Sequence, residues 1–166
     1  MIYEPVEICA AVMAAQFEAK MTALIAAKGV AGGVDPSVTV YKRRSAEIYA
    51  PLEATTLPGL GIYCTSVRTQ MKRQGSRDST PTIVFDYFAR GTDAEVLARQ
   101  CELAAEAIIA VLDLIPVSGN DGLWEAGAIE GSVTVAIQGS SHIEGQDNYE
   151  DRVIVTCPVE FRDVGL

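Results

Sequence analysis

Apolar residues recur at helical spacing in two long segments of the chain. The first runs from about Pro5 to Lys28 and the second from Thr92 to Ile115, and in both the apolar positions form one stripe along a helix. Thr92 and Glu95 have the spacing of a capping box, and Pro116 would end the second helix. We therefore expect two α-helices that each turn one apolar face toward the core.

Alternation of apolar and polar side chains predicts β-strands in the remaining segments. Strands are expected at Val38–Arg43, Glu47–Tyr49, Ile62–Met71 and Thr82–Arg90, and in a final hairpin of residues 132–138 with Val153–Phe161. The segment Thr82–Arg90 is apolar on both faces, so it should be a central strand covered on both sides, or on one side by another subunit. Pro158 cannot donate to a ladder, so its strand should lie at an edge or turn that position outward.

These elements predict one α+β domain over residues 1–166, with a mainly antiparallel sheet flanked by two helices and a long basic hairpin. Flexible loops are expected at about 29–37, 45–60, 72–80 and 139–150, and a further loop contains the only tryptophan, Trp124. A hydrophobic content of 49% with 21% charged residues argues against disorder. The mean hydropathy of +0.19 indicates either alanine-rich helices or apolar surface reserved for a partner.

The charges of the chain are unevenly distributed. The net charge is −9, yet seven of the thirteen Lys and Arg residues lie in two short stretches. These seven residues are Lys42, Arg43, Arg44, Arg68, Lys72, Arg73 and Arg77. Beyond residue 100 there are twelve acidic residues, and the only cations are Arg152 and Arg162. A chain that is basic in one region and acidic in another is suited to head-to-tail association, which closes into a ring when the rotation allows.

The basic residues have three interpretations. As an interface, they would dock onto an acidic surface of a neighbouring subunit or another partner. As nucleic-acid contacts, Arg68, Lys72, Arg73 and Arg77 would bind phosphates, although a pI near 4.5 disfavours a dedicated nucleic-acid binder. As plain surface charges, they would keep a solvated hairpin from pairing edge to edge with other chains.

No motif in the sequence predicts catalysis. The only histidine, His142, lies in a Gly/Ser-rich segment, and neither G-x-S-x-G nor H-E-x-x-H occurs. Asp147, Glu150 and Asp151 form an acidic cluster, but without the spacing of a calcium loop a solvated loop is the simpler interpretation. We expect no catalytic residue, no cofactor site and no metal site, and we expect that the protein is not an enzyme.

The cysteines and the N-terminus bear on the location of the protein. Cys9, Cys64, Cys101 and Cys157 are scattered singly, so we expect four reduced thiols in the core. No run of about 18 uncharged apolar residues occurs, so no transmembrane helix or membrane contact is expected. A secretory signal is not expected either, because Glu4 stands where such a signal would have a cation.

The order of elements resembles that of the tail terminator proteins of long-tailed bacteriophages, also called tail completion or head–tail joining proteins. The shared layout is an amphipathic N-terminal helix, a strand, a long polar hairpin that enters PTIVFDYFARG, a capped helix TDAEVLARQCELAAEAIIAVL, and a final hairpin that ends VIVTCPVEFRDVG. The resemblance covers nearly the whole chain as a pattern of elements. It supplies no catalytic residues.

This resemblance implies a structural virion protein located in the tail or neck, and in the host cytoplasm before assembly. It implies a homohexameric ring that caps the tail tube, ends tube polymerisation and joins the tail to the head or neck. The implied partners are other copies of the chain, the tail tube protein, and a neck, head-completion or connector protein. Double-stranded DNA would pass through the lumen without specific binding, which suits an acidic wall.

Two alternatives remain open at this point. The first is a different neck or head-completion protein, such as a stopper or connector, which would use the same assembly logic. The second is a small α+β enzyme or ligand-binding domain with a pocket under Trp124, Tyr63 and Tyr87.

Overall fold

The computed structural model describes residues 3–29, 32–42, 58–71, 77–114, 124–129, 133–142, 145 and 148–163. Its elements, in chain order, are α1 (Tyr3–Lys28), β1 (Thr39–Lys42), β2 (Gly59–Met71), β3 (Arg77–Gly91), α2 (Ala94–Leu112), β4 (Trp124–Ile129), β5 (Thr134–His142) and β6 (Tyr149–Asp163). Within these residues six strands form one sheet, and all strand pairs are antiparallel except β1 with β2. The predicted α+β class with a mainly antiparallel sheet is confirmed.

The strands lie in the order β1, β2, β3, β6, and two strands share the outer side of β6. β5 pairs with the first half of β6, from Tyr149 to Thr156, and β4 pairs with its last part, from Val159 to Asp163. β3 lies between β2 and β6, so the prediction that this strand is central is confirmed.

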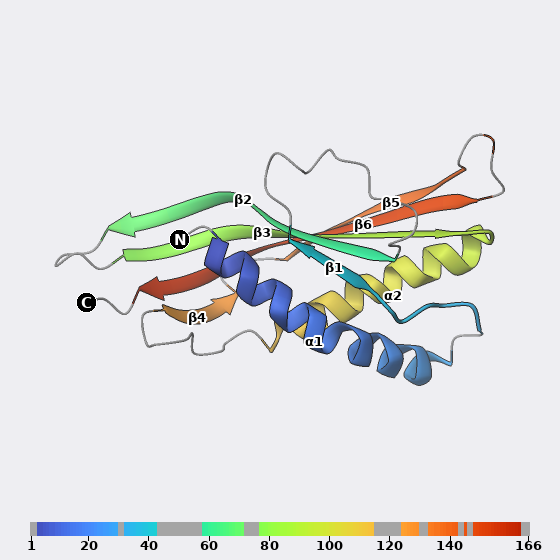
Figure 1. Cartoon of the computed structure of the whole chain (residues 1–166), viewed down its shortest axis with the longest axis horizontal. Coiled ribbons are helices and arrows are strands. Elements are labelled where there is room, and N and C mark those ends of the chain that lie inside the picture. Colours follow the sequence, from blue (N-terminus) through green and yellow to red (C-terminus); the bar gives the residue numbers. More distant parts are fainter. Residues whose placement is uncertain are drawn as a thin grey trace.

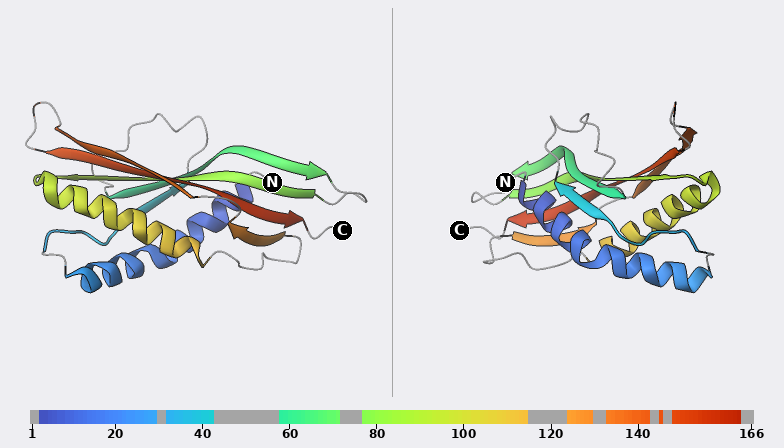
Figure 2. Two further views of the ribbon diagram at one scale, coloured as in Figure 1. Left: turned by 180° about the vertical axis from the view of Figure 1, so that it is seen from behind. Right: turned by 45° about the vertical axis from the view of Figure 1, so that its right-hand side comes forward.

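Both helices cover the same face of the sheet and cross each other beneath it (Figures 1 and 2). α1 lies mainly against β1 and β2 and reaches β3 through Phe17, whereas α2 lies against β3, β5 and β6. The described part of the chain is therefore a two-layer structure, in which each helix covers one half of the sheet.

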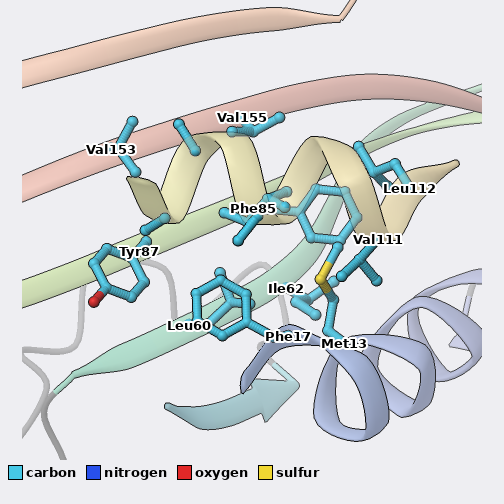
Figure 3. Close-up of a cluster of buried hydrophobic side chains, with 14 of the residues drawn as sticks. Met13, Phe17, Leu60, Ile62, Phe85, Tyr87, Val111, Leu112, Val153 and Val155 are labelled. Atoms are coloured by element: carbon cyan, nitrogen blue, oxygen red, sulfur yellow. The ribbon is translucent and has the colours of Figure 1, made fainter. Parts of the chain in front are cut away.

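The core fills the space between the two layers, as Figure 3 shows. β3 contributes the fully buried side chains of Ile83, Phe85 and Tyr87, and α1 contributes Met13 and Phe17. The rings of Phe17 and Tyr87 stack with their centroids 5.9 Å apart. The predicted apolar stripe of the first helix is thus confirmed as a core face.

α1 is also long and apolar enough to span a membrane, with a mean hydropathy of 1.4 over its most apolar window. Its large apolar side chains, such as Met13, Phe17 and Met21, are the ones buried against the sheet and α2. Its exposed face consists mostly of alanine, with Glu18 and Thr22 among the alanines. Core packing and alanine together account for the hydropathy of this helix.

The N-terminus of α2 differs from the prediction. The N-cap is Asp93, whose Oδ1 accepts hydrogen bonds from the backbone N–H groups of Glu95 and Val96 at 3.0 and 3.2 Å. The predicted capping box placed the cap one residue earlier, at Thr92. A carboxylate at the cap also stabilises the positive end of the helix dipole, which explains why Asp93 takes this position.

Strands β2 and β3 are longer than predicted. Gly59 and Leu60 were expected in a loop, but they pair in parallel with β1, and Leu60 is fully buried. Residues 77–80 were also expected in a loop, but they belong to β3, which continues through a buried Pro81. Pairing with β2 and β6 holds this part of β3 extended on both sides, and that pairing overrides the breaker signal of the proline.

The C-terminal half of the sheet contains two further corrections. The predicted loop around Trp124 is strand β4, and the predicted loop 139–150 contains the end of β5 and the start of β6. Pro158 predicted that its strand lies at an edge of the sheet or turns this position outward. β6 is not an edge strand. Pro158 lies between the β5-paired and the β4-paired parts of β6, where its missing N–H interrupts neither ladder.

Some predictions fall outside the described residues. The short strand Glu47–Tyr49, the tip of the basic hairpin at residues 72–76 and the helix stop at Pro116 are among them.

A buried hydrogen-bond network attaches the segment after α1 to the core. The side-chain amide of Gln100 donates to the Tyr87 hydroxyl at 2.9 Å, and its oxygen accepts from the backbone N–H of Asp35 at 3.2 Å. Gly33 adopts a φ of +110°, and a Cβ there would lie 3.3 Å from a methyl group of Val96. A glycine at this position therefore lets the segment lie close against α2.

The cysteines are free thiols, as predicted. Burial raises the pKa of Cys9, Cys101 and Cys157 to about 12 each, and partial burial raises that of Cys64. We expect that a thiol reagent at pH 8 modifies at most Cys64 in the native protein and all four cysteines in urea, because only the thiolate reacts. Rapid native modification of two or more thiols would contradict the buried positions.

The same pKa shifts set an alkaline limit on stability. A free thiol has a pKa of about 9, so above that pH the unfolded chain releases thiol protons that the folded chain retains. We expect the free energy of unfolding to fall as the pH rises above about 9. Urea titrations at pH 7.5 and 10, compared with a Cys9→Ala variant, would measure this contribution.

Candidate assembly surface

The second half of β2 extends beyond the helices, at the left of Figure 1. Residues Gly59 to Tyr63 are buried, whereas every residue from Thr65 to Met71 is exposed. The register with β3 shifts between Cys64 and Ser66, so a bulge separates the two halves. We call Thr65–Met71 the β2 arm. Among the apolar side chains of the arm, Val67 is 38% exposed and Met71 is 75% exposed.

The predicted basic interface is partly described by the structure. Lys42 is the last residue of β1, Arg68 lies in the β2 arm, and Arg77 is the first residue of β3, opposite Met71. The remaining four, Arg43, Arg44, Lys72 and Arg73, fall outside the described residues.

Lys42 and Arg68 lie on the same edge of the sheet but on different faces. Lys42 pairs with Ile62, whose side chain enters the core, so it lies on the helix side and makes an ion pair with Glu7 of α1 at 3.4 Å. Arg68 pairs with Thr80, which places it on the face away from the helices. The two basic stretches therefore do not form one continuous patch at these positions.

On the opposite side of the sheet, β5 forms an edge without charged residues. β5 contains no Asp, Glu, Lys, Arg or Pro, and its residues from Thr134 to Gly139 are all exposed. The alternation of apolar and polar residues in this strand predicts one buried face with Val135 and Ile137 on it, but these two side chains are 40% and 54% exposed. Their partners on β6, Val155 and Val153, are fully buried. The core therefore ends at β6, and β5 presents its apolar side chains to solvent.

The helix beneath this edge is acidic on its outer side. The exposed stripe of α2 and its C-cap is formed by Glu95, Arg99, Glu102, Glu106, Ile109 and Asp113. Four of these six side chains are acidic, and among them only Glu106 has an ion pair with a cation of α1, Lys28. The helix that contacts β5 thus has a mostly acidic exposed side, whereas the β2 edge contains Lys42 and Arg68.

The sheet face away from the helices contains a buried ion pair that was not predicted. Arg152 of β6 donates through Nε to Oδ1 of Asp86 at 2.8 Å and through a second nitrogen to the other carboxylate oxygen. Asp86 is fully buried, and the guanidinium lies 4.5 Å from the ring centroid of Phe88. These hydrogen bonds raise the pKa of Arg152. The sequence signal was an aspartate within the apolar run TIVFDYF, since a buried charge needs a partner.

The proposed ligand pocket is not formed by its two tyrosines. Tyr87 pairs with Leu60 and faces the helices, whereas Tyr63 pairs with Val84 on the other face. The sheet separates the two rings, so they cannot line one cavity.

The acidic residues and the histidine that were considered as candidate sites have structural contacts. Within the described residues, no three His, Cys, Asp or Glu side chains are grouped as metal ligands. Glu150 makes an ion pair with Arg90 at 3.1 Å, and Asp151 is buried and accepts from the backbone of Arg152. His142 ends β5 and contacts the edge of Tyr149, so it lies in a strand and not in the predicted loop.

Comparisons with known proteins give matches among solved structures. No family model and no curated protein matches the chain. Among solved structures, the chain is similar to one in the "Virion of native gene transfer agent (GTA) particle", with a TM-score of 0.32 and 13% sequence identity. The match covers 89% of this chain and 97% of that one. At this level of agreement the likeness does not assign a family.

Proposed function

We propose that the protein is a structural subunit of a phage-like virion, and specifically a tail terminator that forms a homohexameric ring. The ring would cap the tail tube, end its polymerisation and join the tail to the head or neck. Support for this role comes from the order of elements described above and from the two unlike edges of the sheet.

The difference between these two edges is the observation that carries the proposal. One edge has the β2 arm, with exposed Val67, Met71 and Arg68. The other has β5, with exposed Val135 and Ile137, and β5 contacts α2, whose exposed side is mostly acidic. Unlike surfaces on opposite sides of one subunit favour a head-to-tail contact, which closes into a ring at a suitable rotation.

The charge of the whole chain fits a lumen through which DNA passes. At a net charge of −9, the ring would repel phosphate groups on average and would not retain the DNA. The tail tube protein would bind one rim of the ring. A neck or connector protein would bind the other rim when the tail joins the head.

The test of the proposal is the mass of the purified protein in solution. Light scattering after size exclusion, over a range of concentrations and salt, should give a discrete species of six subunits that loosens as salt rises. A monomer or dimer under every condition would contradict the proposal.

Charge reversal in the basic hairpin tests the electrostatic part of the contact. We expect Arg68→Glu combined with Arg73→Glu to weaken assembly and to leave the melting temperature nearly unchanged, because Arg68 is exposed and an exposed charge contributes little to folding. The readout is the concentration of half-assembly at 50 mM and 300 mM salt, beside a thermal melt.

The matched control is Arg99→Glu, which reverses an exposed cation on the acidic stripe of α2. Arg99 lies on α2 and not on either edge strand, so assembly should be unchanged. A large loss of melting temperature in the Arg68 variant would instead assign these side chains to the fold.

A further inference from the structure

We propose that β5 of one copy of this chain pairs with the outer edge of the β2 arm of the next copy, so that the sheet continues from subunit to subunit. This inference rests on the self-association proposed above and specifies the strands that form it. The occupant of the β5 edge is therefore a second copy of the chain.

β5 lacks the features that keep edge strands from pairing with other chains. Exposed edges commonly contain lysine, proline, inward-pointing charges or covering elements. β5 has no charged residue and no proline, and within the described part of the chain it pairs along one side only, with β6. Its register with β6 stays regular from Thr134 to Gln138 and shifts only beyond that point. A regular, uncharged strand of five residues is therefore available for a further partner.

The β2 arm offers a second available edge. Within the described residues, β1 pairs with β2 only from Gly59 to Ile62 and leaves the arm without a neighbour on that side. The arm contains no proline and has a single cation, Arg68.

The apolar side chains of the two edges lie on the same face of the sheet. Val135 and Ile137 pair with the core-facing Val155 and Val153, so they lie on the helix side. Val67 and Met71 pair with Pro81 and Arg77 and alternate with Arg68, so they also lie on the helix side. Pairing of the two edges would bring these four side chains into cross-strand contact and remove them from water.

The strand directions permit this contact without inverting the next copy. β2 is antiparallel to β3, β3 to β6, and β6 to β5, so β5 and β2 run in opposite directions within one subunit. A second copy in the same orientation therefore presents its β2 arm antiparallel to β5. This is the head-to-tail relation that a ring requires.

The register also fixes how far neighbouring copies are displaced. Ala136, at the middle of the β5 edge, is level with Gly61 of its own β2 through Ile154 and Asp86. A register that keeps Val135 and Ile137 on the face of Val67 and Met71 sets Ala136 opposite Arg68 or Gln70. The β3 partners of Arg68 and Gln70 are Thr80 and Asp78, which lie six and eight positions from Asp86, or about 20 to 27 Å along the strand. Each copy would be displaced by about this distance along the strands, so the strands would be inclined to the direction of repeat, as in closed barrels.

Disulfide trapping tests the pairing directly. Double variants that combine Ile137→Cys with Val67→Cys, Thr69→Cys or Met71→Cys cover the possible registers. These variants are made in a Cys64→Ser background, which removes the one native thiol expected to react. On mild oxidation of the protein, at least one combination should give a ladder of linked subunits on a non-reducing gel. Each single variant should remain unlinked, because the contact joins two different edges. Ile137→Cys with Ala23→Cys, a position on the exposed face of α1, is the control and should stay unlinked.

Ile137→Lys provides an independent test, because it places a charge on the β5 edge. Ile137 is 54% exposed, so the fold should persist, while the concentration of half-assembly should rise by at least about tenfold. Ala23→Lys adds the same charge on α1 and should leave assembly unchanged.

The outcomes separate this inference from the proposed function. If discrete rings form but no pair of cysteines links, and Ile137→Lys assembles like the parent, the strand pairing is wrong and the ring stands. If Ile137→Cys alone links efficiently, two β5 strands pair with each other, and the head-to-tail contact is wrong. If no oligomer forms at any concentration or salt, both the proposed function and this inference fail.

Discussion

Replacement of Arg152 with alanine is expected to lower the free energy of unfolding by about 3 kcal/mol. The guanidinium makes two hydrogen bonds to Asp86, a carboxylate with no exposed surface, and it also covers the ring of Phe88. Removal of one partner of a buried ion pair typically costs about 3–5 kcal/mol, because the other charge stays buried. We expect the lower end of this range, since the Arg152 side chain remains 26% exposed.

Arg90→Ala is the matched control for this prediction. Arg90 makes a similar contact with Glu150 from β3 to β6, but both side chains are about one-third exposed. A loss of less than about 1 kcal/mol is expected there. Urea unfolding of both variants measures the two values. Equal effects in the two variants would contradict the claim that burial of Asp86 makes the first pair important.

Replacement of Phe17 with alanine is expected to lower the free energy of unfolding by about 3–5 kcal/mol, and this loss is also read from urea unfolding. Phe17 is fully buried in α1, and its ring stacks on Tyr87 of the central strand. Truncation removes most of the contact between α1 and the sheet at this point and leaves a cavity that the neighbouring strand cannot fill. Figure 3 shows the ring among Met13, Leu60 and Ile62.

Gln16→Ala serves as the control for this substitution, because Gln16 is the exposed neighbour of Phe17 on α1. It should change stability by less than about 0.5 kcal/mol. If Phe17→Ala costs less than about 1 kcal/mol, α1 does not pack on β3 as described.

Elements with a one-sided pattern could be predicted from the sequence. α1 was recognised because its large apolar side chains recur at helical spacing, and those side chains form its buried face. β6 was recognised because residues from Val153 to Val159 alternate in polarity, and the apolar ones are buried. In both elements the local pattern and the tertiary packing agree.

Elements that depend on distant partners could not be predicted. β4 has no alternation of its own, and it is a strand because it pairs with the end of β6. The extension of β3 through Pro81 is held by neighbours on both sides. The ion pair of Asp86 with Arg152 joins residues 66 positions apart, which only the pairing of β3 with β6 brings together.

The candidate surface could be predicted in part. The charge pattern identified the basic stretches, but not that Lys42 and Arg68 lie on opposite faces of the sheet. The alternation in β5 predicted which side chains share a face, but not that Val135 and Ile137 stay exposed. The exposure of an edge strand depends on how far the helices cover the sheet. The sequence of the strand alone does not determine that coverage.

The number of subunits in the assembled species tests the central claim most directly. Native mass spectrometry of the purified protein, with negative-stain images of the same sample, counts the subunits and shows whether the assembly is closed. A single closed species of six subunits, with a central opening, is the predicted result. A protein that remains a monomer at every concentration and salt, or that forms only a symmetric dimer, would contradict the head-to-tail ring.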